Sequence, residues 1–219
     1  DLGYKPLKSN HPFGGPGAHN GGRLRFGPDG FLYATIGDNH NGPGPQSPTE
    51  MRGKLLRVDR DGKAAPGNNP PAGFDKRVFA YGFRNPQGIA FRPGSGDVYL
   101  SENGPWHSDE VTKVVNGGNG GWDPRDNVNG RGDCPDRYCG YSPNQMGALP
   151  PKDRAAFMSM TDTKAYPNAM RPAWNNNGLS QGMCGSVWLE GKQWKEWEGR
   201  LAVGYALSLI HISEPTRPY

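Results

Sequence analysis

Short alternations of apolar and polar residues, separated by turns, run through most of the chain. The first two are residues 23–26 and 31–36, joined by Gly27-Pro28-Asp29-Gly30. A period of two is typical of strands, and a Pro-Asp-Gly turn favours an antiparallel reversal. By the same reasoning we predict further strands at 54–58, 78–81, 88–91, 97–101, 109–115, 186–189 and 197–203.

The order of strand, turn, strand, loop and strand occurs three times along the chain. Phe26 and Phe91 hold matching places in the first two copies, and the third copy begins at Ser186. A sheet of three or four strands cannot bury both faces alone, so the copies must stack. We therefore predict an all-β fold, a β-propeller of four-stranded antiparallel blades, with about three blades within residues 1–206.

Two segments lie outside this pattern. Residues from about 120 to 183 form a long insertion rich in Gly, Asn and Pro, to which we assign no mechanism. Residues 207–219 show neither strand alternation nor a clear helix, and we interpret them as a non-native tail. Because closed propellers need at least four blades and Asp1 is not an initiator methionine, we expect the chain to be part of a larger protein.

Composition and charge favour one class of protein and argue against two others. Hydrophobic residues make up only 33% of the 219 residues, and 34 glycines and 22 prolines punctuate short apolar runs, which favours a turn-rich all-β protein. The net charge of +4 comes from scattered Lys and Arg, which argues against a nucleic-acid surface. No run reaches the roughly 18 apolar residues of a membrane span, so we expect none.

Two of the three cysteines, Cys134 and Cys139, lie close together in a loop-like stretch. A local disulfide is the favoured interpretation, with free thiols as the alternative, because the spacing does not fit a zinc pair and no His lies between them. A disulfide would place the protein in an oxidising compartment. We therefore expect a secreted or periplasmic protein.

A polar cluster lies between two strand-like runs at residues 81–88. Arg84, Asn85 and Gln87 stand among Gly82, Pro86 and Gly88. Polar groups at a strand end or loop are where sites are commonly built. The alternative is a loop whose Arg and Asn bond nearby carbonyls.

The order and spacing of several motifs resemble those of the soluble quinoprotein glucose/sorbosone dehydrogenases. The resemblance is strong over about 19–122 and weaker over 185–206, and Gly120 stands where that family has Tyr. The motifs are 18–24, 26–30, 52–58, 82–88, 102–105 followed by Asp109-Glu110, and 117–122.

This resemblance implies a six-bladed propeller that binds pyrroloquinoline quinone (PQQ) and calcium. It implies oxidation of the anomeric hydroxyl of an aldose-type sugar to a lactone by hydride transfer to PQQ, with an external electron acceptor. His19 corresponds to the general base and a cofactor contact, and an imidazole is basic enough near neutral pH for this role. Arg84 and Asn85 correspond to contacts with the quinone oxygens, where a planar cation would stabilise developing negative charge.

The next motif implies the metal site. Gly104 and Pro105 correspond to residues whose main-chain carbonyls bind calcium, a cation that prefers oxygen ligands. Asn103 corresponds to a cofactor contact, although better-known members carry Gln there. Asp109 and Glu110 either hold the calcium loop or face solvent.

Further residues are expected around the site. Trp106 and His107 are expected to line the substrate mouth. Asp38, His40 and the loop to Thr49 are expected to form a rim over the site, with a second metal site as the alternative for Asp38. A Lys and two Arg that contact the cofactor in the family have no counterpart in this sequence. We therefore expect the chain alone to be weakly active or inactive.

Two other functions compete with this interpretation. One is a non-catalytic binding propeller of the hedgehog-interacting type, which has no physical need for His19, residues 84–88 and Gly104-Pro105 together. The other is a calcium-dependent lactonase propeller, which needs converging carboxylates at the metal, and the sequence shows no clear set of these.

Overall fold

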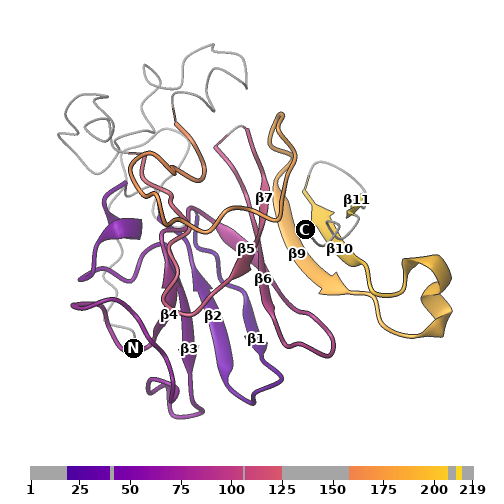
Figure 1. Cartoon of the computed structure of the whole chain (residues 1–219), viewed down its shortest axis with the longest axis horizontal. Helices are drawn as coiled ribbons and strands as arrows, with labels where there is room; N and C mark the ends of the chain where they lie inside the picture. The colour runs from indigo at the N-terminus through magenta and orange to yellow at the C-terminus, as the bar shows by residue number, and fades with distance from the viewer. Residues whose placement is uncertain (1–18, 40–41, 106, 125–157, 207–210, 214–219) are drawn as a thin grey trace.

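The computed structural model describes residues 19–39, 42–105, 107–124, 158–206 and 211–213. Within these ranges the chain forms three antiparallel sheets that follow one another in sequence and lie side by side in Figure 1. The predicted all-β fold class is confirmed, while the number of blades and the closure of a propeller stay predictions.

The first sheet is a simple meander in which each strand pairs with the next. Its hairpin reverses where the sequence predicts, since Phe26 pairs with Leu32 and the Gly30 amide donates to the Gly27 carbonyl at 3.0 Å. The strand order is β1 (Leu24–Phe26), β2 (Leu32–Ile36), β3 (Lys54–Val58) and β4 (Val78–Tyr81).

The second sheet repeats this order, and its last strand comes from an unexpected part of the chain. Trp174 pairs with Val111, so the segment interpreted as an insertion supplies the fourth strand. The sheet consists of β5 (Pro86–Phe91), β6 (Val98–Glu102), β7 (Glu110–Val114) and β8 (Trp174–Asn175).

The third sheet differs from prediction in two places. Lys192–Trp197 forms a 3₁₀ helix, so the strand predicted from residue 197 begins only at Leu201. The prediction that the tail lacks a strand is wrong at residues 211–213, where Ser213 pairs with Leu201. The sheet consists of β9 (Met183–Trp188), β10 (Leu201–Tyr205) and β11 (His211–Ser213).

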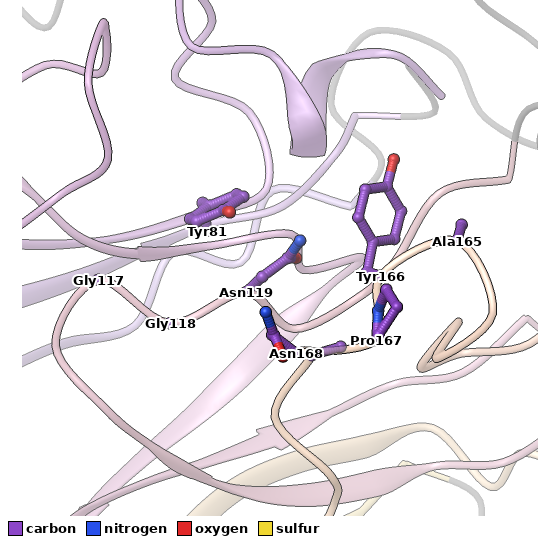
Figure 2. A pocket seen from close by; sticks show the side chains of 9 residues that line it. Tyr81, Gly117, Gly118, Asn119, Ala165, Tyr166, Pro167 and Asn168 are labelled. Atoms are coloured by element: carbon purple, nitrogen blue, oxygen red, sulfur yellow. The ribbon is translucent and has the colours of Figure 1, made fainter.

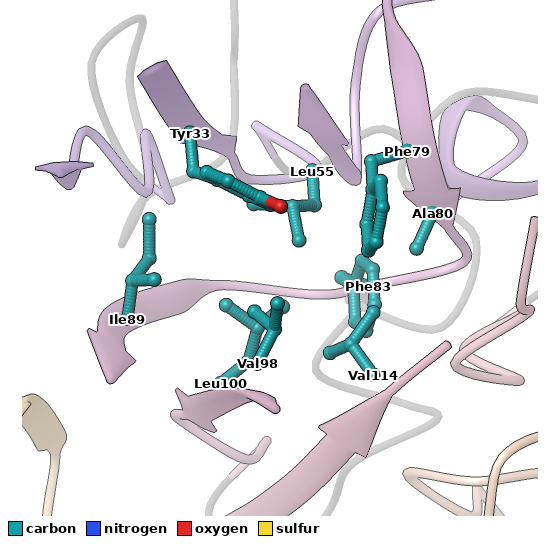
Figure 3. Close-up of a cluster of buried hydrophobic side chains, with 9 residues drawn as sticks. All are labelled: Tyr33, Leu55, Phe79, Ala80, Phe83, Ile89, Val98, Leu100 and Val114. Carbon is teal, nitrogen blue, oxygen red and sulfur yellow. The ribbon is translucent and has the colours of Figure 1, made fainter. Parts of the chain in front are cut away.

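Alternation along the strands divides the apolar side chains of each sheet between its two faces. On β3, Leu55 faces the cluster between the first and second sheets, whereas Leu56 faces the opposite side of the first sheet. On β5, Ile89 belongs to the first layer and Ala90 to the layer between the second and third sheets. The first layer, shown in Figure 3, consists of Tyr33, Leu55, Phe79, Ala80, Phe83, Ile89, Val98, Leu100 and Val114.

The first strands of the three sheets lie against one another. The Nη1 atom of Arg25 on β1 donates to the Ile89 carbonyl on β5 at 3.0 Å and to the Ser186 carbonyl on β9 at 3.2 Å. One side chain therefore ties all three sheets together along their inner edges. This arrangement brings the chain segments that follow β2, β4 and β6 to a common region.

Candidate functional site

The candidate site lies in four loops: the one before β1, the one after β2, the one between β4 and β5, and the one after β6. His19 precedes β1, Asp38 follows β2, Arg84 and Asn85 lie between β4 and β5, and Asn103 follows β6. Gly37 permits the close approach of these loops, because a Cβ atom there would collide with the His19 carbonyl. The structure thus brings together predicted residues that are up to 84 positions apart.

His19 is held between an acid and a cation. Its Nδ1 lies 2.9 Å from Oδ1 of Asp38, and its Nε2 lies 3.1 Å from Nη2 of Arg84. Because a guanidinium can only donate, Nε2 must accept, and Nδ1 therefore carries the proton and donates to Asp38. His19 also has a positive φ of 51°, an uncommon backbone conformation that is concentrated at functional sites.

Asp38 lies beneath the site and is fully buried. Its Oδ2 accepts a hydrogen bond from the indole Nε1 of Trp122 at 2.8 Å, while its own amide donates to the Arg84 carbonyl at 2.7 Å. Because Asp38 is buried, the prediction that it forms part of a rim over the site is wrong, and His40 lies outside the described residues. No group of three or more His, Cys, Asp or Glu that could hold a metal occurs in the described part of the chain, so a second metal site at Asp38 has no support.

Arg84 contacts His19 directly, whereas the side chain of Asn85 contacts the loop that follows His19. Nη1 of Arg84 donates to the Asn103 carbonyl at 2.6 Å, and the guanidinium carbon lies 5.8 Å from the ring centre of Trp122. The Oδ1 atom of Asn85 accepts from the Gly21 amide at 3.2 Å. The cation is only 5% exposed, so its charge acts in a poorly solvated environment.

A buried carboxylate beneath this loop fixes its backbone. Oε1 of Glu102 accepts hydrogen bonds from the amides of Arg84 and Asn85, the latter at 3.0 Å. Burial, followed by repulsion from Glu110, raises the pKa of Glu102 to about 8. Glu102, which has no predicted role, therefore fixes the backbone of Arg84 and Asn85, the residues predicted to contact the quinone.

The loop after β6 is organised around Asp109. Its Oδ1 accepts from the Gly104 amide at 2.8 Å and from the Ser180 hydroxyl at 2.6 Å, and its Oδ2 accepts from the Gln181 amide at 2.8 Å. The Ser180 hydroxyl also lies 2.9 Å from Oδ1 of Asn103. Asp109 is fully buried, so it holds the loop, and the solvent-facing alternative is wrong.

Glu110 is buried as well, so the solvent-facing alternative is also wrong for this residue. Its Oε2 accepts from the Thr161 hydroxyl at 2.9 Å, and its Oε1 accepts from the Asn175 amide at 2.8 Å. Burial raises the pKa of Glu110 to about 7, despite these two hydrogen bonds. Glu110 thus links β7 to the segment that contains β8.

The donor groups present fit the cofactors that the sequence implies. Gly104 and Pro105 are buried, and within the described residues neither carbonyl oxygen accepts a hydrogen bond, so both suit a calcium ion. A guanidinium, an imidazole and an amide side chain close together suit the oxygens of a quinone.

One prediction about the mouth of the site is wrong. His107 is only 1% exposed and forms an isolated bridge with Leu179, so it cannot line an open substrate mouth. Trp106 lies outside the described residues.

A cavity of about 310 Å³ lies elsewhere on the described surface. Figure 2 shows Tyr81, Asn119, Tyr166 and Asn168 among the residues around it. Its lining contains neither His19 nor Arg84, so the chemistry predicted from the sequence lies outside it.

Three residues that organise the site were given no role by the sequence analysis. Trp122 ends a motif that matched the family, so its position offered a signal. Glu102 stands in another matched motif, directly before Asn103. Ser180 lies in the segment interpreted as an insertion, where no motif pointed to it.

Comparisons with known proteins point to the same family as the sequence motifs described above. A family model described as Glucose / Sorbosone dehydrogenase matches residues 4–214. The chain is 38% identical over 109 residues to aldose sugar dehydrogenase YliI of Escherichia coli K12, covering 48% of this chain and 29% of that protein. It is 36% identical over 123 residues to quinoprotein glucose dehydrogenase B of Acinetobacter calcoaceticus, covering 48% and 26%.

A solved structure shows the same likeness in three dimensions. The PQQ-bound form of aldose sugar dehydrogenase from Streptomyces coelicolor superposes with a TM-score of 0.57 and 26% identity, covering 86% of this chain and 42% of that chain. The chain thus matches less than half the length of each of these relatives.

Two further observations concern the helices and the cysteines. None of the helices in the described residues has the length and apolar character needed to cross a membrane. Cys184 has a free thiol, whereas Cys134 and Cys139 lie outside the described residues, so their pairing stays a prediction.

Proposed function

Because the chain belongs to the glucose/sorbosone dehydrogenase family, we propose that it carries the catalytic base and part of the PQQ site of a sugar dehydrogenase. The proposed reaction is oxidation of the anomeric hydroxyl of an aldose-type sugar to a lactone. The observation that carries the proposal is the contact of His19 with both Asp38 and Arg84. An imidazole oriented by a carboxylate beside a buried cation is suited to proton removal coupled to hydride transfer.

Each side chain has a distinct role in this proposal. His19 takes the proton of the anomeric hydroxyl on Nε2, the nitrogen that faces the donating guanidinium of Arg84. Asp38 keeps Nδ1 protonated and stabilises the imidazolium that results. Arg84 supplies positive charge next to the base.

PQQ supplies the hydride acceptor of this reaction when it is bound. Arg84, Asn85 and Asn103 are the residues of this chain that would hold it, and Gly104 and Pro105 would hold the calcium ion through their carbonyls. Asp109 keeps the Gly104 backbone in place. The fit of these donor types, together with the similarity to a quinoprotein and to a PQQ-bound enzyme, supports this assignment.

Several broader expectations belong to the same proposal. The three stacked sheets are taken as blades of a propeller whose other blades are not among the described residues, and residues 1–206 as its partial domain. An external electron acceptor completes the catalytic cycle. A secreted or periplasmic location follows if Cys134 and Cys139 form the predicted disulfide.

The non-catalytic binding propeller is the alternative. A propeller used only for binding does not require an imidazole whose tautomer is fixed between an acid and a cation. The contacts of His19 therefore favour the enzyme.

The proposal can be tested by titrating the chain with PQQ, with and without calcium, and following cofactor absorbance before and after addition of aldoses. We expect calcium-dependent binding but at most slow reduction by a sugar, because a Lys and two Arg of the family have no counterpart in this chain. His19→Gln should reduce the remaining rate about 10²- to 10⁴-fold. Asn20→Ala, an exposed neighbour of the base, is the control. Absence of PQQ binding in the presence of calcium would contradict the proposal for this chain, whereas binding without reduction by any aldose would indicate a cofactor site that lacks the missing Lys and Arg side chains.

A further inference from the structure

The carboxylate of Asp38 is fully buried and is held from two sides. His19 donates to Oδ1 from Nδ1 at 2.9 Å, and Trp122 donates to Oδ2 from Nε1 at 2.8 Å. A buried carboxylate needs such donors, because leaving either oxygen without one is costly. The carboxylate cannot turn about its side-chain bond without losing one of these hydrogen bonds.

The ring of Trp122 is fully buried, and hydrogen bonds hold its backbone in addition. Its amide donates to the Gly82 carbonyl at 2.9 Å, and its carbonyl accepts from Nε2 of Gln46 at 3.0 Å. The ring packs with Met158 and Met160. Backbone and ring are therefore both anchored in the orientation that directs the indole N–H at Oδ2 of Asp38.

Gln46 is anchored in turn. It forms a reciprocal pair with Asn119, donating to Oδ1 at 3.0 Å and accepting from Nδ2 at 2.9 Å. It lies in the short 3₁₀ helix η1 (Gly44–Gln46), whose Gly44 and Pro45 carbonyls each accept from the buried Nζ of Lys54 at 2.9 Å. A continuous set of hydrogen bonds thus leads from β3 through η1 to Trp122.

The same indole contacts the cation of the site. The guanidinium carbon of Arg84 lies 5.8 Å from the Trp122 ring centre, a distance compatible with cation–π attraction. Arg84 contacts Nε2 of His19, while Asp38 contacts Nδ1. Trp122 therefore contacts both Asp38 and Arg84, the two residues that hold the imidazole of His19.

We propose that Trp122 is a positioning residue for His19. Its N–H fixes the Asp38 carboxylate in the orientation that keeps the proton of His19 on Nδ1, and its ring holds Arg84 beside Nε2. Gln46 supports this arrangement by holding the Trp122 backbone. The role in catalysis rests on the proposed sugar dehydrogenase function, whereas the control of the His19 tautomer does not.

The test is NMR of the ¹⁵N-labelled chain at a pH where the His19 ring is neutral. The two ring nitrogen shifts report which nitrogen carries the proton, and His19→Gln assigns them. We expect the wild type to show a proton on Nδ1, and Trp122→Phe to show shifts averaged between both tautomers. An unchanged Nδ1–H tautomer in Trp122→Phe would overturn the proposal.

The matched control is Trp188→Phe. Trp188 is also buried, at 6% exposure, but its indole N–H makes no hydrogen bond within the described part of the chain. This substitution removes the same atoms from a core position and should leave the His19 shifts unchanged. An equal response of His19 to both substitutions would indicate a general packing effect and overturn the proposal.

A second measurement covers the case in which Trp122→Phe does not fold. Asp38→Asn replaces a charged acceptor by a weaker neutral one. The indole proton resonance of Trp122 should then move upfield while that of Trp188 stays in place. A Trp122 resonance that does not move would overturn the proposal.

Turnover of the PQQ-loaded chain supplies the catalytic readout. We expect Trp122→Phe to lower kcat about 10- to 100-fold, as loss of a group that orients an active-site ligand commonly does, with little change in KM. Wild-type protein that binds no PQQ in the presence of calcium would contradict the proposed function, and the NMR result would still decide whether Trp122 controls the tautomer.

Discussion

Nη2 of Arg84 lies 3.1 Å from Nε2 of His19, so the cation and the base predicted from separate motifs contact each other directly. The contact engages the lone pair that His19 needs for proton removal. In the proposed enzyme, a sugar hydroxyl therefore has to replace this hydrogen bond at Nε2, while Trp122 keeps the guanidinium close to the imidazole. The fork of Arg84 is suited to such a change of partner, because it offers several donors in one plane.

The first prediction concerns the geometry of this cation. Arg84→Lys keeps the positive charge, but a single ammonium cannot reproduce the separate contacts with His19 and the Asn103 carbonyl. We expect sugar oxidation to slow by about 10²- to 10³-fold, as when a preorganised donor is lost. Steady-state kinetics of the PQQ-loaded protein checks this. Arg92→Lys at an exposed position should be neutral, and an unchanged rate in Arg84→Lys would show that charge alone is sufficient.

The second prediction concerns the loop proposed to bind calcium. The two oxygens of Asp109 accept three hydrogen bonds, from Gly104, Ser180 and Gln181. In Asp109→Asn one oxygen becomes an amino group that can only donate, so at least one of these bonds is lost. We expect calcium affinity to fall about 10- to 100-fold, the usual effect of losing a group that orients metal ligands.

Calorimetric titration with calcium measures this directly, without PQQ or sugar. Asp61→Asn, at an exposed position, is the matched control and should leave the affinity unchanged. Equal calcium affinities in wild type and Asp109→Asn would argue against a role of this loop in binding the metal.

Much of the fold follows from local sequence, because alternation and turn residues suffice to define β1, β2, β3 and their neighbours in the second sheet. The assignment of His19 and Arg84 to one site rested on the order of the motifs and not on any single one. Strand β8 could not be predicted, since Trp174 and Asn175 are only two residues and show no period. Their pairing depends on the exposed edge of β7.

The surroundings of the base could not be predicted for a different reason. A Gly-Asp pair after a strand is ordinary turn chemistry, and Asp38 becomes buried only because Trp122, 84 residues later, covers and bonds it. Ser180 reaches Asn103 across 77 residues. Contacts over such distances arise from the stacking of sheets, which local patterns do not encode.

The third prediction concerns pH and stability. Burial raises the pKa of Glu110 to about 7 from an ordinary value of 4.5. Between these values the folded chain retains a proton that the unfolded chain has released. Stability should therefore fall as the pH rises from 4.5 to 7, with a slope of at most about 1.4 kcal/mol per pH unit from this group.

Glu110→Gln removes this ionisation while keeping the shape of the side chain. We expect its free energy of unfolding, measured in urea at a series of pH values, to fall less steeply than that of the wild type over this range. Glu102 lies opposite on β6 and has a raised pKa as well, so part of the slope should remain. Glu190→Gln at an exposed position should retain the wild-type slope, and a wild-type slope in Glu110→Gln would contradict the prediction.

The last prediction tests the layer between the first and second sheets. Leu100 on β6 is fully buried there, whereas Leu24 on β1 is 65% exposed. Leu100→Ala leaves a cavity in a packed layer and should lower the free energy of unfolding by about 2–5 kcal/mol. Leu24→Ala should change it by less than about 0.5 kcal/mol, as is usual for surface positions. Urea unfolding of both variants decides the matter, and equal effects would mean that the two sheets do not share this apolar layer.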